Sequence, residues 1–242
     1  MNTIAIIQAR MGSNRLPGKV MKILGDRSVL GHVIKRCLAI PSVNQVVVAT
    51  SNLEEDTIIC QEAERYGVSY YRGSQENVLS RYYEAAKENG AENIVRITSD
   101  CPLLDPNISE SVISHFLDNN FDYSSSGLSG TFPRGLDTEV FTFYALERCY
   151  LEATIEYEHE HVTPYIYQHP EFFNFYKYYN SEDDSRYRLT LDTPEDWKLI
   201  QLIYKELYKG EIFYWEEIRQ LLKNRPELMM INEGVKQKIL GE

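Results

Sequence analysis

Basic and small residues gather in one short stretch near the start of the chain. The stretch QARMGSNRLPGKV contains Arg10, Arg15 and Lys19 together with Gly12 and Ser13. Guanidinium and ammonium groups bind phosphate oxygens, and glycine or serine lets backbone N–H groups approach a ligand closely. Lone basic residues in a loop are also commonly solvated, but a triphosphate suits this set of donors. The stretch therefore predicts an anion site.

The stretch differs from both standard phosphate-binding loops. A Walker loop has four residues between its glycines and a hydroxyl residue after its lysine. Here five residues separate Gly12 from Gly18, and Val20 follows Lys19. The dinucleotide pattern G-x-G-x-x-G is absent as well. The predicted anion site is therefore of another kind.

Short apolar runs alternate with stretches of helical periodicity through the first half of the chain. The predicted strands are 4–7, 46–50, 68–71, 94–98 and 121–124, and the predicted helices are 28–40, 54–66, 76–89 and 107–120. This alternation predicts an α/β fold, with a mainly parallel sheet and helices on its faces. The basic stretch directly follows the first strand. It therefore lies at the carboxyl ends of the strands, where such sheets bind ligands.

The second half of the chain changes in character. Residues 126–137 are rich in glycine, proline and serine and predict a long loop, a common location for function. Aromatic residues are dense in 141–150 and 165–179, which suggests a smaller mixed lobe packed on the sheet.

Helices are predicted again near the end of the chain. Thr193 as N-cap, followed by Pro194 and two acids, opens a helix. A further helix is expected over 214–223, and a loosely held tail from Pro226 onward. We expect one domain over 1–242, with a core of 1–207 and a C-terminal helical tail of 208–242.

Composition excludes several classes of protein. The 242 residues carry a formal charge of −11, with a pI near 5.0, which argues against a general nucleic-acid or anionic-membrane binder. The basic charge is local to the N-terminal part. The four cysteines fit no metal or redox spacing, and no apolar run is long enough to span a membrane. We expect a soluble, cytoplasmic protein without membrane insertion.

Several motifs resemble one enzyme family. QARMGSNRLPGKV is followed in order by YYRGSQENVLSRYYEAA, VRITSDCPLLDP, FPRGLDTEVF, EHEHVTPYIYQHP and LTLDTPEDW. This series is similar to the sugar-acid cytidylyltransferases, the CMP-KDO and CMP-acylneuraminate synthetase group. It is most similar to their spore-coat polysaccharide (SpsF-like) branch. The resemblance implies a Rossmann-like nucleotide-diphospho-sugar transferase fold with a small sugar-side lobe.

The resemblance also implies a reaction. These enzymes transfer CMP from CTP to a sugar or sugar-acid hydroxyl and release pyrophosphate, here for surface polysaccharide biosynthesis. Arg10, Arg15 and Lys19 match the phosphate-binding positions of the family, with Arg15 and Lys19 expected to stabilise the departing pyrophosphate. Related enzymes are commonly dimers, so a homodimer is possible.

Two aspartates are the candidates for binding Mg²⁺ in such a reaction. Asp100 follows the strand ending at Thr98, and Asp192 ends the strand-like run YRLTLD. Carboxylates from two strand ends, with water and phosphate oxygens, meet the preferences of Mg²⁺. The alternatives are that Asp100, near Pro102, forms a turn and that Asp192 caps a helix. We also expect Asp100 to be a catalytic residue, together with Arg15 and Lys19.

Base recognition is expected from the loop after the third strand. Arg72 matches the family position that contacts the pyrimidine edge, and Ser74 lies in the same loop. Because arginine has no acceptor, it cannot alone reject uracil. A backbone carbonyl near 49–52 or 74–80 would have to accept from the cytosine amine. The alternative for Arg72 is a surface salt bridge.

Five residues match positions that face the acceptor in the resembling enzymes. They are Arg134, Asp137, Glu139, His161 and Tyr165. Polar groups of these kinds can orient a hydroxylated sugar, and an arginine can pair with a sugar carboxylate. A core or interface role is the alternative for His161.

Other functions remain open, as does the acceptor. Cys101 follows Asp100 where many relatives have an acid, and Gln8 stands where the KDO enzymes often have proline. Neither KDO nor sialic acid is therefore specified. A glycosyltransferase of related fold would usually carry a D-x-D pair, whereas TSDCPL offers one aspartate. A non-catalytic nucleotide-binding subunit is the third possibility.

Overall fold

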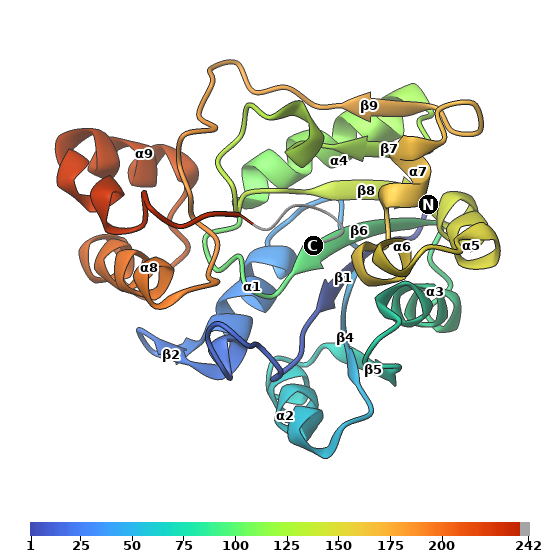
Figure 1. Cartoon of the computed structure of the whole chain (residues 1–242), viewed down its shortest axis with the longest axis horizontal. Helices are drawn as coiled ribbons and strands as arrows, with labels where there is room; N and C mark the ends of the chain where they lie inside the picture. Colours follow the sequence, from blue (N-terminus) through green and yellow to red (C-terminus); the bar gives the residue numbers. More distant parts are fainter. Residues whose placement is uncertain (238–242) are drawn as a thin grey trace.

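A mixed sheet forms the centre of the molecule (Figure 1). In the computed structural model, which describes residues 1–237, the sheet has seven strands in the order β5-β4-β1-β6-β8-β7-β9. The strands are β1 Thr3–Gln8, β4 Gln45–Ser51, β5 Ser69–Gly73, β6 Asn93–Thr98, β7 Tyr123–Ser125, β8 Glu139–Thr142 and β9 Phe175–Lys177. Neighbours from β5 to β6 are parallel, β8 runs antiparallel to β6 and β7, and β9 is parallel to β7. The predicted fold class is confirmed.

The parallel half of the sheet brings four loops to one edge. Gln8 at the end of β1 pairs with Ala49 of β4 and Thr98 of β6, and Thr50 of β4 pairs with Arg72 of β5. Because these strands run in the same direction, the segments that follow them all leave from the same edge. The basic stretch after β1 therefore lies in one row with the segments after β4, β5 and β6.

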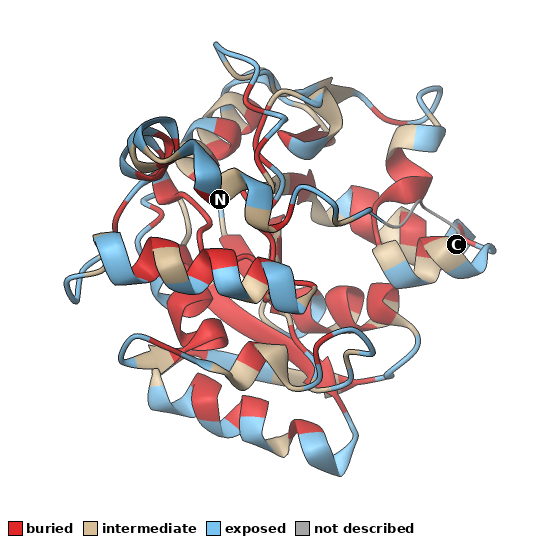
Figure 2. Cartoon of the chain, turned by 60° about the vertical axis from the view of Figure 1, so that its left-hand side comes forward, coloured by how far each residue is buried: buried red, intermediate tan, exposed pale blue. Residues whose placement is uncertain are grey.

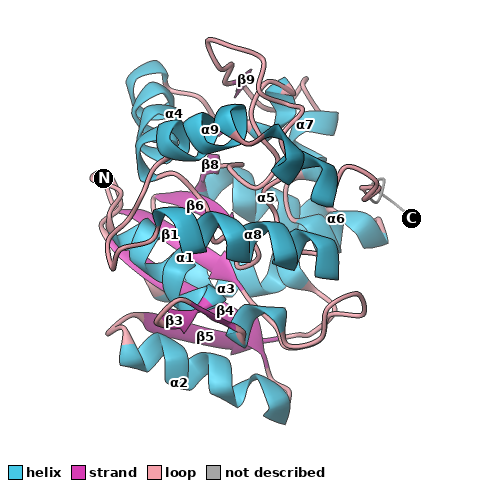
Figure 3. Ribbon diagram, turned by 90° about the vertical axis from the view of Figure 1, so that its left-hand side faces the viewer, coloured by secondary structure: helices cyan, strands magenta, loops and turns pink. Residues whose placement is uncertain are grey.

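Helices cover both faces of the sheet (Figures 1 and 3). The helices on one face are α1 Val29–Leu38, α2 Thr57–Arg65 and α4 Pro106–Asn119, and those on the other are α3 Val78–Glu88 and α5 Phe143–Glu152. Alternation along β1 explains this division, since Ala5 and Ile7 pack with the first set and Ile4 and Ile6 with the second. The sheet and the inward sides of the helices are buried (Figure 2).

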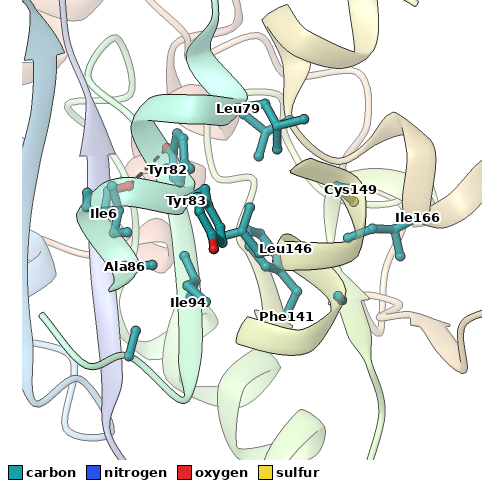
Figure 4. Packing of buried hydrophobic residues seen from close by; sticks show 14 of the residues in the cluster. Ile6, Leu79, Tyr82, Tyr83, Ala86, Ile94, Phe141, Leu146, Cys149 and Ile166 are labelled. Atoms are coloured by element: carbon teal, nitrogen blue, oxygen red, sulfur yellow. Dashed lines mark hydrogen bonds between the residues drawn. The ribbon is translucent and has the colours of Figure 1, made fainter. Parts of the chain in front are cut away.

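Aromatic and aliphatic side chains fill the space between α3, α5 and the sheet (Figure 4). The Tyr82 hydroxyl donates to the backbone oxygens of Ile6, at 3.0 Å, and Ile97, at 3.2 Å. Tyr83 stacks on Tyr150 with a ring-centroid distance of 4.1 Å. The short helices α6 Glu156–His161 and α7 Pro164–Gln168 add to this cluster. The aromatic segments thus form much of the core on this side.

A third apolar cluster lies beyond the strand ends. It joins α8 Pro194–Leu207, α9 Trp215–Asn224 and the 3₁₀ helix η4 Pro226–Ile231 to a hairpin formed by β2 Ile23–Leu24 and β3 Arg27–Ser28. Three other 3₁₀ turns are η1 Lys19–Met21, η2 Glu54–Asp56 and η3 Gly127–Ser129. Thr193 caps α8 as predicted, and its hydroxyl accepts from the Asp196 N–H. No helix within residues 1–237 combines the length and apolar character needed to cross a bilayer.

The strand predicted from YRLTLD is wrong. Leu189 N–H donates to the Arg134 oxygen, at 2.7 Å, but Leu191 N–H donates to the Asp100 oxygen, at 2.8 Å. Because the N–H groups of Leu189 and Leu191 bond to two different segments, residues 187–192 do not pair with one strand as a sheet strand would. We call this extended segment the strap. Asp192 therefore reaches the strand ends from outside the sheet.

The prediction of a loosely held tail from Pro226 onward is also wrong for residues 226–237, which the structure describes. Leu228 is only 2% exposed within the third cluster. The Asn232 amide donates to the Arg188 oxygen, at 3.1 Å, and to Asp196 Oδ1, at 2.8 Å. These contacts fix the segment against the base of α8. Residues 238–242 of the predicted tail lie outside the described residues.

Candidate active site

A bent loop after β1 carries the basic residues. Gly18 adopts φ 64°, a left-handed conformation that glycine reaches without steric cost. Its N–H donates to the Met11 oxygen, at 3.2 Å, and the Met11 N–H donates to Asp56 Oδ1, at 2.7 Å. The loop is thus closed on itself and tied to the segment after β4. Asp56, which was not predicted as a site residue, is a buried anchor for this loop.

Lys19 joins the two aspartates predicted to bind a metal. Its ammonium nitrogen lies 2.8 Å from Asp100 Oδ2 and 2.9 Å from Asp192 Oδ1. It also donates to the backbone oxygen of Leu191, at 2.7 Å. The side chain is only 12% exposed. Residues from β6's end, the strap and the basic loop therefore meet at one point.

Arginines flank Asp192 on both sides. Arg15 lies 3.0 Å from Asp192 Oδ1 through one guanidinium nitrogen, and Arg188 lies 3.1 Å from Oδ2. Arg15 remains 35% exposed along its side chain, so solvent and solutes reach it. The predicted residues Arg15, Lys19, Asp100 and Asp192 thus form one contiguous charged cluster.

Lys19 and Asp100 are held in their ionised forms. Burial alone would lower the pKa of Lys19, but the charges of Asp100 and Asp192 outweigh burial and raise it. Burial opposes ionisation of Asp100 as well, yet Lys19 lowers the pKa of this carboxyl below its usual range. At neutral pH the ammonium and carboxylate are therefore both charged.

The oxygen atoms around Lys19 suit a hard divalent cation. Asp100 Oδ2, Asp192 Oδ1 and the Leu191 carbonyl surround one point, and Mg²⁺ prefers such oxygen ligands. In the described part of the chain, no group of three or more His, Cys, Asp or Glu side chains could hold a metal. A metal at this point would therefore take its remaining ligands from phosphates and water.

A second set of polar residues holds Asp192 in place. Asp196 is fully buried and accepts from the Asp192 N–H at 3.0 Å, the Thr193 N–H at 3.1 Å and the Arg188 guanidinium at 2.9 Å. Arg188 bridges Asp196 and Asp192. Arg188 and Asn232 were not predicted. The one sequence signal for Arg188 was its position four residues before Asp192 and eight before Asp196, and Asn232 had no such signal.

The other phosphate-binding candidates lie on the open side of the loop. Arg10 and Gly12 are exposed, and a Cβ atom at Gly12 would come no closer than 3.7 Å to Glu55. Ser13 Oγ accepts from the Leu16 N–H, at 3.4 Å, and so helps to shape the loop. These residues leave room for a ligand beside Arg15.

The base-recognition candidates shape neighbouring loops. Arg72 donates to the backbone carbonyls of Ser51, at 3.1 Å, and Leu53, at 2.7 Å. These partners are uncharged, so the contacts differ from the surface salt bridge that was the alternative for Arg72. Ser74 Oγ accepts from the Asn77 N–H, at 3.1 Å, and the Ser74 carbonyl accepts from the buried Arg81, at 3.0 Å. Arg81 was missed because nothing in the sequence separates it from the exposed arginines of helices. Arg72 stays a predicted reader of the base.

Asp137 and Glu139 are the two acids predicted to face the acceptor substrate, and they differ in how many partners their carboxylates have. Glu139 pairs with Arg96 and accepts from the hydroxyls of Tyr123, at 2.8 Å, and Thr163, at 2.5 Å. Asp137 Oδ2 accepts from the Gly135 N–H, at 3.0 Å. Burial raises the pKa of Asp137, and the Gly135 N–H opposes this effect. Glu139 is thus fully engaged, whereas Asp137 keeps an oxygen for another partner.

The other acceptor candidates are distributed differently. Arg134 is exposed, and its backbone pairs with the strap at Arg188. Burial lowers the pKa of His161, with smaller effects from the charges of Glu160, Arg96 and Glu139. Tyr165 lies in the core, where its hydroxyl donates to Glu152 of α5, at 2.5 Å. Its one polar side-chain group is used in this contact, and Tyr165 stays a predicted acceptor-binding residue.

The chain is similar to known proteins over most of its length. A family model described as cytidylyltransferase matches residues 4–236. The chain is 40% identical to an uncharacterized protein of Methanocaldococcus jannaschii over 247 aligned residues, which cover 100% of this chain and 99% of that protein. It is 33% identical to the spore coat polysaccharide biosynthesis protein SpsF of Bacillus subtilis, with 94% and 97% of the two chains covered.

Solved structures are also similar. A cytidylyltransferase from Leptospira borgpetersenii superposes with a TM-score of 0.91 at 35% identity, and 99% of each chain is covered. A CMP:2-keto-3-deoxy-manno-octonic acid synthetase solved with CTP superposes with a TM-score of 0.65 at 16% identity, covering 86% of this chain and 100% of that one. This second likeness shows the fold. The chain belongs to the cytidylyltransferase family and is a nucleotidyltransferase.

Proposed function

We propose that this enzyme transfers CMP from CTP to a hydroxyl of a sugar or sugar acid, with Mg²⁺ as cofactor and pyrophosphate as the second product. The observation that carries the proposal is the meeting of Lys19 and Arg15 with Asp100 and Asp192 at the strand ends. The similarity to SpsF supports a place in surface polysaccharide biosynthesis.

The reaction breaks one bond to phosphorus and forms another. The acceptor hydroxyl oxygen attacks the α-phosphorus of CTP and releases its proton to water, and the bond from this phosphorus to the oxygen bridging to the β-phosphate breaks. Negative charge then grows on the leaving pyrophosphate, where cations stabilise it. Arg15 and Lys19 are the cations within the cluster that are free to exchange their carboxylate partners for phosphate oxygens. No protein nucleophile is needed.

Asp100 and Asp192 would hold the Mg²⁺ ion. When bound, the ion neutralises phosphate charge and favours the departure of pyrophosphate. Arg10, Gly12 and Ser13 complete the phosphate site from the open side of the loop. Asp192 owes its position to Arg188 and Asp196, so that the protein fixes one carboxylate before any ligand arrives.

The base and the acceptor lie to the two sides of the phosphates in this proposal. Arg72 orders the segment 51–53 and, with the Ser74 loop, forms the cytosine side. Asp137 binds an acceptor hydroxyl, and the exposed Arg134 is available for a sugar carboxylate. His161 lines the same side near Glu139.

The enzyme is also proposed to form a homodimer. Tyr144 and Leu151 lie on one side of α5 and are 57% and 72% exposed, and Ile155 after the helix is 47% exposed. Apolar residues exposed together are common at interfaces between copies. The mass of the particle in solution, measured by light scattering, tests this part.

Pyrophosphate release tests the proposed reaction. The purified enzyme is incubated with Mg²⁺, CTP and a panel of neutral sugars, octulosonic acids and nonulosonic acids. We expect pyrophosphate with at least one acceptor, together with the matching CMP-sugar by mass spectrometry, and a much lower rate with UTP. Pyrophosphate from UTP at an equal rate would contradict the assignment of CTP. No pyrophosphate with any acceptor would contradict the proposed substrate class.

A further inference from the structure

Lys19 occupies the position that a divalent cation would take. Its ammonium nitrogen lies between 2.7 and 2.9 Å from Asp100 Oδ2, Asp192 Oδ1 and the Leu191 carbonyl. An ammonium group has three donors, and here each of the three has one oxygen acceptor. All three oxygens are also of the kind that Mg²⁺ prefers. The lysine and the metal therefore compete for the same ligands.

The charges around this point leave no place for a further cation. Asp100 and Asp192 together carry two negative charges, and Lys19, Arg15 and Arg188 supply positive charge to them at 3.1 Å or less. A divalent ion that entered while Lys19 stayed would meet its ammonium at contact distance in a partly buried site, where repulsion is weakly screened. Metal binding therefore requires that Lys19 leave.

The phosphates of a nucleotide give Lys19 somewhere else to go. Its side chain is a flexible four-carbon chain that begins at η1, directly after the exposed part of the basic loop. Phosphate oxygens bound beside Arg15 would be new acceptors for the ammonium within the same loop. Arg188 has no such freedom, because it is also paired with the fully buried Asp196.

We infer that Lys19 makes metal binding depend on nucleotide: its ammonium fills the cation position of the free enzyme and leaves it when the phosphates of a nucleotide accept its hydrogen bonds. The Leu191 carbonyl is then the third protein oxygen available at that position. This inference rests on the proposed function, since it assumes that Asp100 and Asp192 hold the metal. It adds an order of events, in which free metal is not bound ahead of nucleotide.

Titration with Mn²⁺ tests the inference without turnover. Free Mn²⁺ is measured by its electron paramagnetic resonance signal in the presence of wild-type enzyme, Lys19→Met and Lys19→Gln, with no acceptor present. Each titration is repeated with CTP, and CTP alone provides the correction for metal bound in solution. Lys35→Met is the matched control, because Lys35 is an exposed lysine of α1 outside the cluster.

Without CTP, we expect both Lys19 variants to bind Mn²⁺ at least tenfold more tightly than the wild type. Adding Asp192→Asn to Lys19→Met should abolish the gain, and Lys35→Met should behave as the wild type. With CTP, the wild type should bind Mn²⁺ more tightly than CTP alone does. Circular dichroism checks that each variant is folded. Two substitutions of Lys19 are used so that the test can still be made if one variant does not fold.

Two results separate the inference from the function on which it rests. Equal Mn²⁺ affinity of the wild type and both variants without CTP would overturn the inference, while binding by the wild type with CTP would leave the proposed function intact. Lack of any Mn²⁺ binding beyond that of CTP alone, in all proteins, would instead overturn the proposed metal site. A gain in Lys35→Met equal to that in the Lys19 variants would overturn the specific role of Lys19.

Discussion

Single residues of the candidate site are placed by ion pairs that the chain forms without any ligand. Lys19 contacts both aspartates, and Arg15 and Arg188 share Asp192. Such pairs lose hydration on burial, and the attraction between the charges offsets this loss only in good geometry. The site is therefore preformed, with its charges already facing each other before a substrate binds.

Gly135 is a position where only glycine fits. It adopts φ 100°, and a Cβ atom there would lie 2.6 Å from both the Leu189 carbonyl carbon and the Thr190 nitrogen. Gly135→Ala should therefore lower the free energy of unfolding by more than about 2 kcal/mol, because backbone strain and a backbone clash add. Gly130→Ala is the control, since Gly130 has φ 66° and nothing lies within 4 Å of its Cβ position. Urea denaturation measures both, and equal losses would contradict the steric argument.

The residues of the cluster could be predicted to different extents. Arg15, Lys19, Asp100 and Asp192 could be chosen from their positions at the ends of predicted elements and from motif resemblance. Arg188 and Asn232 could not, because their importance comes from partners that only the folded chain brings near. The contact of Tyr165 with Glu152 could not be predicted either, since Glu152 belongs to a helix that was not predicted.

At the scale of elements, the strap of residues 187–192 brings Asp192 to the site. Its apolar alternation is that of a strand, because Leu189 and Leu191 point into the third apolar cluster. Its hydrogen bonds go to two different segments, and this division cannot be foreseen from periodicity. The capped start of α8 could be predicted, because Thr193, Pro194 and the acids that follow are local signals.

Asp196 ties the strap to α8, and its loss should destabilise the protein. Asp196→Asn removes the fully buried charge that pairs with Arg188 and leaves this partly buried guanidinium with Asp192 as its only carboxylate partner among the described residues. We expect a loss of about 3 kcal/mol in the free energy of unfolding. Glu195→Gln, an exposed acid in the same turn, should change stability by less than about 0.5 kcal/mol. Equal effects in guanidinium denaturation would show that the network contributes nothing specific.

Helix α1 carries a buried histidine that should make stability depend on pH. Burial lowers the pKa of His32 to about 4, with smaller effects from the nearby charges of Arg27, Arg36 and Asp26. The Nε2 atom contacts the Leu24 oxygen, and the ring packs edge-on against Tyr204, with a centroid distance of 4.6 Å. The neutral form is therefore the one that the fold accommodates.

The sign of the pH effect follows from the two pKa values. An unfolded histidine titrates near 6.5. Between that pH and about 4 the unfolded chain binds a proton that folded His32 does not, so this contribution to stability is complete above 6.5 and falls as the pH drops. We expect a loss on the order of 2–3 kcal/mol at pH 4.5 relative to pH 7, with a smaller loss in His32→Gln. Identical pH slopes for the two proteins in urea denaturation would refute this.

At the scale of the whole molecule, the parallel half of the sheet could be predicted and the antiparallel half could not. Strands β1, β4, β5 and β6 are apolar runs separated by helices, a pattern that leads to parallel pairing. Strand β8 lies between β6 and β7, so that β7, the next strand after β6 in the chain, is not the one that pairs with β6. Strand β7 overlaps the strand predicted over 121–124, whereas β9, of three residues, carries too little periodicity to be recognised.

The C-terminal part of the chain completes the molecule around the site. Helix α9 and η4 close the third cluster, and Asn232 reaches the same Asp196 that holds the strap. The helix predicted over 214–223 is α9, but the packing of α9 and η4 on the third cluster could not be predicted from the sequence.

The turnover of Lys19→Met relative to wild type is the measurement that tests the central claim most directly, with CTP, Mg²⁺ and an acceptor that the wild type uses. If Lys19 stabilises the leaving pyrophosphate, kcat should fall by about 10²- to 10³-fold. Lys35→Met, which removes an exposed lysine of α1, should keep the wild-type rate. A Lys19→Met enzyme that is folded and turns over at the wild-type rate would contradict the account.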